Sequence, residues 1–160
     1  MMNITLAQLG AIGDFVGAIA VLITLFHLAN QIKQNTRAVK ATTQLAISAA
    51  TTEVWRNNCV DLERTKTFFE LSKKEKRTAA EQSFVIGWIM QPVRQQENIY
   101  LTLKLDAIDG DFVDLDSRLL TLFGNKNSPH RRAWDNGELK GFLSADFIDY
   151  VDERLHKMNL

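Results

Sequence analysis

Side chains that could bind or conduct ions recur at heptad spacing in an apolar stretch near the start of the sequence. Almost every residue in the range 6–29 is apolar, and Asp14 and Thr24 are among the few exceptions. Steps of three and four residues place both on one helical face, which we call the polar face. Its members are Gly10, Asp14, Gly17, Val21, Thr24, Gln31 and Asn35. Rings of carboxylate, hydroxyl and amide groups around an axis select cations, and small and polar groups also pack membrane helices together. The pattern fits either use.

Reactive side chains elsewhere do not form a catalytic motif. The sequence contains no G-x-S-x-G, no H-E-x-x-H, no Cys/His metal spacing and no phosphate-binding glycine loop. His27, His130 and His156 lie in separate segments. Only a deep pocket holding Glu97 within hydrogen-bond reach of His130 or His156 would reopen an enzymatic interpretation. We therefore expect no enzyme, no catalytic residue and no cofactor.

A run of aspartates between positions 106 and 116 invites a calcium interpretation. Aligning Gly110 with the invariant glycine of an EF-hand loop puts Leu105 and Ala107 at ligand positions, which excludes that motif. We interpret these aspartates as helix-start acids and turn formers. No metal ligand is expected here or elsewhere.

The polar face belongs to a segment that is long enough to cross a bilayer, because a helix of roughly 20 apolar residues spans the ~30 Å hydrocarbon layer. The opposite flank, the lipid flank, consists of Phe15, Ile19, Leu22 and Phe26. Lipid contact explains these large apolar side chains, whereas a buried carboxylate favours a bundle interior or water. In an alternative interpretation the span begins near Phe15, and Asp14 lies in the outer headgroup layer.

Basic residues follow this segment and none precedes it. Lys33, Arg37 and Lys40 are the nearest ones. Cytoplasmic flanks carry such an excess, so we expect the N-terminus outside and the rest of the chain in the cytoplasm, with these three side chains at anionic lipid headgroups. A cleaved signal peptide is disfavoured because the first five residues contain no positive charge.

The fold is predicted to be all-α. We expect a transmembrane helix over 1–32, a juxtamembrane stalk helix over 33–57, since no Gly or Pro interrupts the chain between Ala18 and Ile86, and a cytoplasmic helical bundle over 58–160. In the bundle, helices are predicted over 60–71, 73–105, 112–123, 129–134 and 145–157. Ser72 and Glu75 match a capping box for the second of these, Ser128-Pro129 starts the fourth, and Ser144 caps the last.

The net charge and the cysteine content limit the classes of partner and the cellular compartment that we expect. The net charge is +0, so no overall field favours nucleic acid. The single Cys59 excludes an intramolecular disulfide and suits a reducing cytosol. We expect Cys59 to be a packed thiol and His130–Arg132 to be a solvated basic patch.

Two stretches resemble a known family. The membrane segment runs into Gln31-Ile-Lys-Gln-Asn-Thr-Arg-Ala-Val-Lys40, and a later pattern consists of Pro129, Arg132, Trp134, Phe142, Phe147, Val151, Asp152 and Leu155. Together they resemble bacterial single-span membrane proteins of unknown function, whose recurring signature is Q-I-R-Q-N-T-R-A-V-R. Where that family commonly has a second Trp beside Trp134, this sequence has Ala133 and Asp135. The resemblance implies a helical fold and a bacterial inner-membrane location, but no activity.

The functional expectation follows from the polar face, because a single spanning helix needs other chains to cover it. We expect a membrane-anchored homo-oligomeric scaffold, or an accessory subunit bound to other membrane protein subunits, with membrane lipids as further partners. The alternative is a small oligomeric cation pore lined by Asp14, Thr24, Gln31 and Asn35. Gln31 and Asn35 also fit a plain amide-rich surface at the membrane exit.

Overall fold

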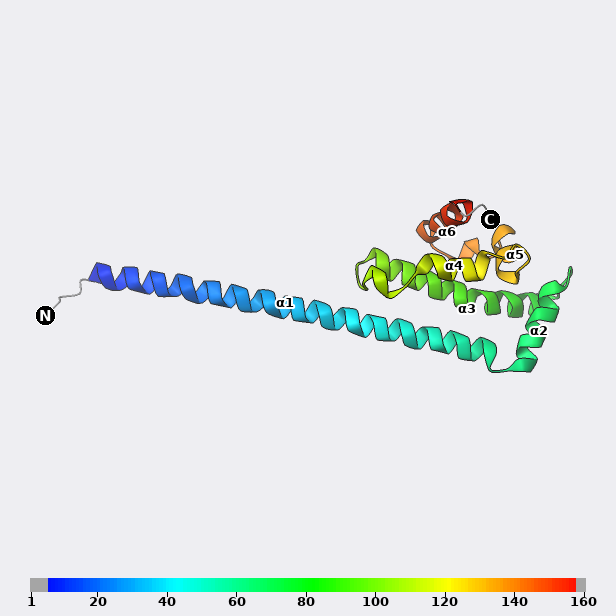
Figure 1. Ribbon diagram of the computed structural model, residues 1–160, viewed down its shortest axis with the longest axis horizontal. Helices are drawn as coiled ribbons and strands as arrows, with labels where there is room; N and C mark the ends of the chain where they lie inside the picture. Colours follow the sequence, from blue (N-terminus) through cyan, green and yellow to red (C-terminus); the bar gives the residue numbers. More distant parts are fainter. Residues whose placement is uncertain (1–5, 158–160) are drawn as a thin grey trace. The chain divides into compact units, whose positions relative to one another are not determined.

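The structure, a computed structural model, describes residues 6–157, except for the side chains of Ala7 and Gln8. Residues 1–5 of the predicted membrane segment lie outside this range. The described chain is helical without strands, which confirms the all-α prediction (Figure 1). Its helices are α1 (Leu6–Cys59), α2 (Leu62–Lys73), α3 (Ala79–Lys104), α4 (Leu115–Phe123), α5 (Pro129–Asp135) and α6 (Ala145–Lys157), with short 3₁₀ turns at Gly110–Phe112 and Lys140–Phe142.

The chain divides into two compact units, and the division falls inside α1, between Ala41 and Thr42. The described residues of the first unit, 6–41, are all helical. By length and composition α1 is able to span a membrane, since an 18-residue window reaches a mean hydropathy of 2.2 and none of that window is buried by the chain. Large apolar side chains such as Phe15 and Phe26 are exposed all around this part of the helix.

The second unit is built around α3, which contacts α2, α4, α5 and α6. Side chains from all six helices form one core: Ile47, Phe68, Val85, Trp88, Ile89, Val93, Ile99, Ile108, Val113, Leu115, Leu119, Phe123, Ala133, Trp134, Leu139, Phe147, Val151 and Leu155. The rings of Phe68 and Trp88 stack with centroids 5.2 Å apart, and the Arg64 guanidinium lies 5.7 Å from the Trp88 ring. Aromatic stacking thus joins α2 to α3.

Within the predicted stalk helix, Ile47 is the residue that joins this core. Ile47 is 8% exposed and Val54 is half-buried, whereas Ala46 and Ala50 are exposed. The core therefore takes its first side chain from α1, well before the predicted start of the bundle at residue 58.

The predicted start of α3 was wrong. Ser72 does not cap a helix; it lies in the last turn of α2, and its hydroxyl donates to the carbonyl oxygen of Phe69 at 2.9 Å. The capping box lies six residues later, where Thr78 Oγ1 accepts from the N–H of Glu81 and the Glu81 carboxylate accepts from the N–H of Thr78. Both pairs match the same sequence pattern.

Two later helices begin and end close to the predicted positions. Ser128 caps α5, and its hydroxyl accepts from the N–H of Arg131 at 3.1 Å, with Pro129 in the first turn. The last helix runs over Ala145–Lys157 as predicted. The predicted helix over 112–123 is shorter, because Asp114 caps α4 and the residues before it form a 3₁₀ turn.

Candidate functional site

The polar face lies on α1, within the first unit, and every member of it is exposed. This holds for Gly10, Asp14, Gly17, Val21, Thr24, Gln31 and Asn35. The lipid flank is exposed as well. Within the described part of the first unit both sides are equally open, so only the chemistry of the side chains distinguishes the two.

Two polar groups on this face already bind within α1. Thr24 Oγ1 donates to the carbonyl oxygen of Ala20 at 2.8 Å, a bond that satisfies a hydroxyl inside an apolar helix. Gln31 Nε2 lies 3.0 Å from His27 Nε2 one turn earlier. The Gln31 amide is therefore hydrogen-bonded to His27, a residue outside the polar face.

The glycines of this segment have open space around them. A Cβ atom added at Gly10, Gly13 or Gly17 would meet nothing within 4 Å. A glycine inside a helix is about 1 kcal/mol less favourable than alanine. No close packing within this chain compensates for that difference.

The three basic residues after the apolar segment remain on the same helix. Lys33 and Arg37 are exposed, and Lys40 is half-exposed. They lie in the first unit, before its end at Ala41. Contact of these three side chains with lipid headgroups stays a prediction.

The segment His130–Arg132 is not the solvated basic patch that the sequence suggested. Arg131 is 8% exposed, and its Nε donates to the Asp135 carboxylate at 2.9 Å. Burial lowers the pKa of His130 to about 4, so its ring is neutral near pH 7. Successive residues of a helix turn by about 100°, so these three side chains enter different surroundings.

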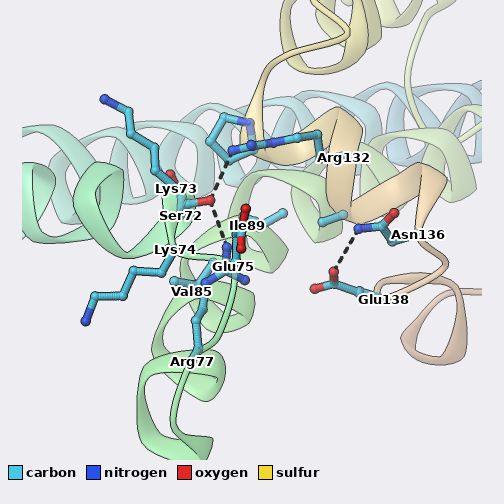
Figure 2. A pocket seen from close by; sticks show the side chains of 12 residues that line it. Ser72, Lys73, Lys74, Glu75, Arg77, Val85, Ile89, Arg132, Asn136 and Glu138 are labelled. Carbon is cyan, nitrogen blue, oxygen red and sulfur yellow. Dashed lines mark hydrogen bonds between the residues drawn. The ribbon is translucent and has the colours of Figure 1, made fainter.

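A cleft of about 260 Å³ opens in the second unit, lined by the end of α2, the loop after it, and parts of α3 and α5. Its polar lining includes Lys73, Lys74, Glu75, Arg77, Arg132, Asn136 and Glu138 (Figure 2). Arg77 Nη2 and Arg132 Nη2 both donate to the carbonyl oxygen of Ser72, at 2.8 and 3.0 Å. Two guanidinium groups from distant segments thus meet at the C-terminal end of α2, where helix carbonyls lack helical partners.

Glu97 is the most deeply buried acid of the described chain, at 2% exposed. Its Oε1 accepts from the backbone N–H of Ser144 at 2.7 Å, and its Oε2 pairs with Arg94. Burial alone would raise the pKa of this carboxyl, but the bonds from Ser144 and Arg94 outweigh it and hold the pKa below its ordinary value. The hydrogen-bond partners of Glu97 do not include His130 or His156.

Two further expectations concern reactive side chains. Cys59 is exposed at the end of α1, so the expectation of a packed thiol was wrong. Cys59 lies 12 residues after Ile47, and this spacing places the two side chains on different faces of α1. Cys59 therefore does not point to the core that buries Ile47. Among the described residues, no three His, Cys, Asp or Glu side chains come together as they would around a metal ion.

Comparisons with protein-family models, with curated proteins and with solved structures find no match for this chain. The site must therefore be interpreted from its own geometry.

No motif in the sequence predicts the cleft. Arg132 and Ser72 are 60 residues apart, and no local pattern links them. One signal was present: the second pair that matches a capping box, Thr78 and Glu81, would have placed residues 74–77 in a loop and Arg77 beside the end of α2.

Proposed function

We propose that this protein is a membrane-anchored scaffold whose copies associate through the polar face of α1. In this proposal α1 crosses the bacterial inner membrane with its N-terminus outside. The second unit then lies in the cytoplasm, where it presents binding surfaces to other subunits. The single observation that carries the proposal is an uncovered apolar helix with Asp14 inside its apolar stretch.

Anchoring is supported by the apolar surface of the first unit. An aqueous protein rarely exposes this many adjacent large apolar side chains, and hydrocarbon provides the surroundings that they require. Lys33, Arg37 and Lys40 come directly after the apolar stretch. A positive flank of this kind marks the cytoplasmic end of a span.

Association is supported by the composition of the polar face. A carboxylate in the bilayer centre costs at least ~2.5–3.5 kcal/mol on insertion scales, so Asp14 is better placed against a neighbouring helix or enclosed water. Gly10, Gly13 and Gly17 would let a second backbone approach closely, because a Cβ added at any of them would meet nothing within 4 Å among the described residues.

Cross-linking in native membranes tests association. Gly17→Leu places a large side chain on the polar face and should reduce the cross-linked oligomer several-fold. Ile19→Phe enlarges a side chain on the lipid flank, about 160° around the helix from Gly17, and should leave the oligomer intact. Recovery of monomer alone from the unaltered protein would refute the proposal, and so would equal oligomer yields from both variants.

The natural cysteine tests the orientation. Because Cys59 is exposed and no other cysteine exists, a membrane-impermeant maleimide should label spheroplasts only after the inner membrane is opened. Labelling of intact spheroplasts would place the second unit outside and contradict the proposed topology.

The position of Asp14 within the apolar stretch also favours a second candidate function, a small cation pore. In that case Asp14, Thr24, Gln31 and Asn35 would line a hydrated axis. Proteoliposomes should then conduct cations, and Asp14→Asn should lower the flux. Flux that is absent, or unchanged in Asp14→Asn, excludes the pore and leaves the scaffold.

A further inference from the structure

Several charged side chains around the cleft have no oppositely charged partner in the described part of the chain. Elsewhere, ion pairs such as Lys104–Asp146, Lys140–Asp152 and Arg154–Asp116 connect different elements. In the cleft, Lys74 pairs with Glu81 at 2.7 Å. Five other charged side chains that line it, Lys73, Glu75, Arg77, Arg132 and Glu138, form no ion pair with any residue of the range 6–157.

Two of these charges are held close together and have the same sign. Since Arg77 Nη2 and Arg132 Nη2 donate to one oxygen, the two guanidinium groups are neighbours. Arg77 is also fixed by Leu71 O at 2.6 Å and by Gln82 Oε1 at 3.0 Å. Neighbouring like charges repel, and an anion placed between them relieves the repulsion.

Both arginines have N–H groups that are not used in these hydrogen bonds. A guanidinium has five N–H groups. Arg132 is exposed and uses one nitrogen, Nη2, in the bond to Ser72 O, so its remaining N–H groups can bind an oxyanion. Charge-assisted bonds from guanidinium to carboxylate or phosphate are among the strongest in proteins.

A negative charge is fixed on another side of the same cleft. Glu138 accepts from Gln82 Nε2 at 2.9 Å and from Asn136 Nδ2 at 3.3 Å, so neutral amides hold its carboxylate in place. Figure 2 shows Asn136 and Glu138 on the right and Ser72, with the guanidinium groups bonded to it, on the left. A ligand in the cleft would meet positive charge on one side and negative charge on the other.

We propose that this cleft binds a small zwitterion, with its phosphate or carboxylate group on Arg132 and Arg77 and its ammonium group on Glu138. The volume of about 260 Å³ suits a molecule of amino-acid size. The proposal concerns the second unit alone and does not depend on membrane association through α1. No covalent step is involved.

Matched ligands separate the two halves of the proposal. Titration calorimetry on the full-length protein in detergent would compare O-phosphoethanolamine with ethyl phosphate, and β-alanine with propionate. Within each pair the second compound lacks only the ammonium group. The zwitterion of at least one pair should bind saturably and several-fold more tightly than its partner.

Variants then assign the charges. Arg132→Gln should weaken binding of the zwitterion and of its matched anion by roughly tenfold or more. Glu138→Gln should remove the preference for the zwitterion and leave the anion unaffected. Lys126→Gln, outside the cleft, is the control, and thermal melts confirm that each variant is folded.

Three results would overturn the proposal. They are no saturable binding of any of the four compounds, equal affinity of Arg132→Gln and the unaltered protein, and a preference for the zwitterion that survives Glu138→Gln. Loss of oligomers in the cross-linking experiment would leave it standing, so the two proposals fail separately.

Discussion

Gln95, in α3, donates from Nε2 to the hydroxyl of Thr51, in α1, at 3.2 Å. The same amide nitrogen lies 3.4 Å from the carbonyl oxygen of Ile47. Since Gln95 is buried, these bonds satisfy a polar group that would otherwise lack partners. They attach the last turns of the long helix to the centre of the bundle.

Two substitutions on α1 should differ sharply in their effect on stability. Ile47→Ala removes a core side chain that is 8% exposed and should lower the free energy of unfolding of the second unit by roughly 2–4 kcal/mol. Leu45→Ala, at a position that is 72% exposed, should change it by about 0.5 kcal/mol or less. Denaturant unfolding monitored by Trp fluorescence measures both, and equal effects would contradict the packing of α1 against α3.

The position of the division inside α1 predicts which fragment folds. A fragment of residues 42–160 keeps Ile47 and Thr51 and should unfold cooperatively. A fragment of residues 60–160 loses both and exposes the core around Ile47 to water, so it should melt at a lower temperature or bind ANS. Circular dichroism melts of the two fragments decide the matter. Identical melts would show that α1 does not contribute to the core.

Acid should act on the second unit through His130. Its pKa is 6.5 in the unfolded chain and about 4 in the folded one, so between these values the unfolded chain binds more protons. Stability from the neutral ring is therefore complete above pH 6.5 and is lost as the pH falls towards 4. The full shift corresponds to about 3 kcal/mol.

Unfolding measured at pH 7 and at pH 4.5 checks this. In His130→Gln, the free energy of unfolding should fall less between pH 7 and pH 4.5 than in the unaltered protein. In His156→Gln, at an exposed position, it should fall as much as in the unaltered protein. An unchanged slope in His130→Gln would contradict the assignment.

Glu97 should act at lower pH. Because its folded pKa lies below the ordinary value of 4.5, its contribution is present above that pH and is lost as the pH falls through the folded value. Glu97→Gln should cost roughly 1–2 kcal/mol at pH 7. Glu153→Gln, an exposed partner of Lys157 on α6, is the matched control and should leave the stability essentially unchanged, because solvent screens exposed ion pairs.

Local signals were sufficient for much of the fold. Ser128 followed by Pro129 predicted the start of α5, because a capping side chain and a fixed φ act within one turn. The helix predicted over 145–157 is α6, and its helically spaced apolar residues Phe147, Val151 and Leu155 are all buried.

Other features depend on contacts between distant residues. Two candidate capping boxes compete at the start of α3, and the sequence alone does not rank Ser72 against Thr78. Arg132 binds the end of α2 from 60 residues away, so the cleft became visible only in three dimensions. The heptad spacing of the polar face of α1 places its residues on one side of the helix. What covers that side depends on groups outside this chain.

The core closes through its C-terminal helix, with Phe147 and Val151 fully buried and Leu155 nearly so. These residues are synthesised after the rest of the core, whereas α1 is synthesised before the bundle. The bundle therefore stays incomplete until α6 has emerged, because domains in general fold as units once their chain has emerged. A stop codon at position 155 would remove Leu155 and release a chain with an open hydrophobic core, which is a substrate for proteases.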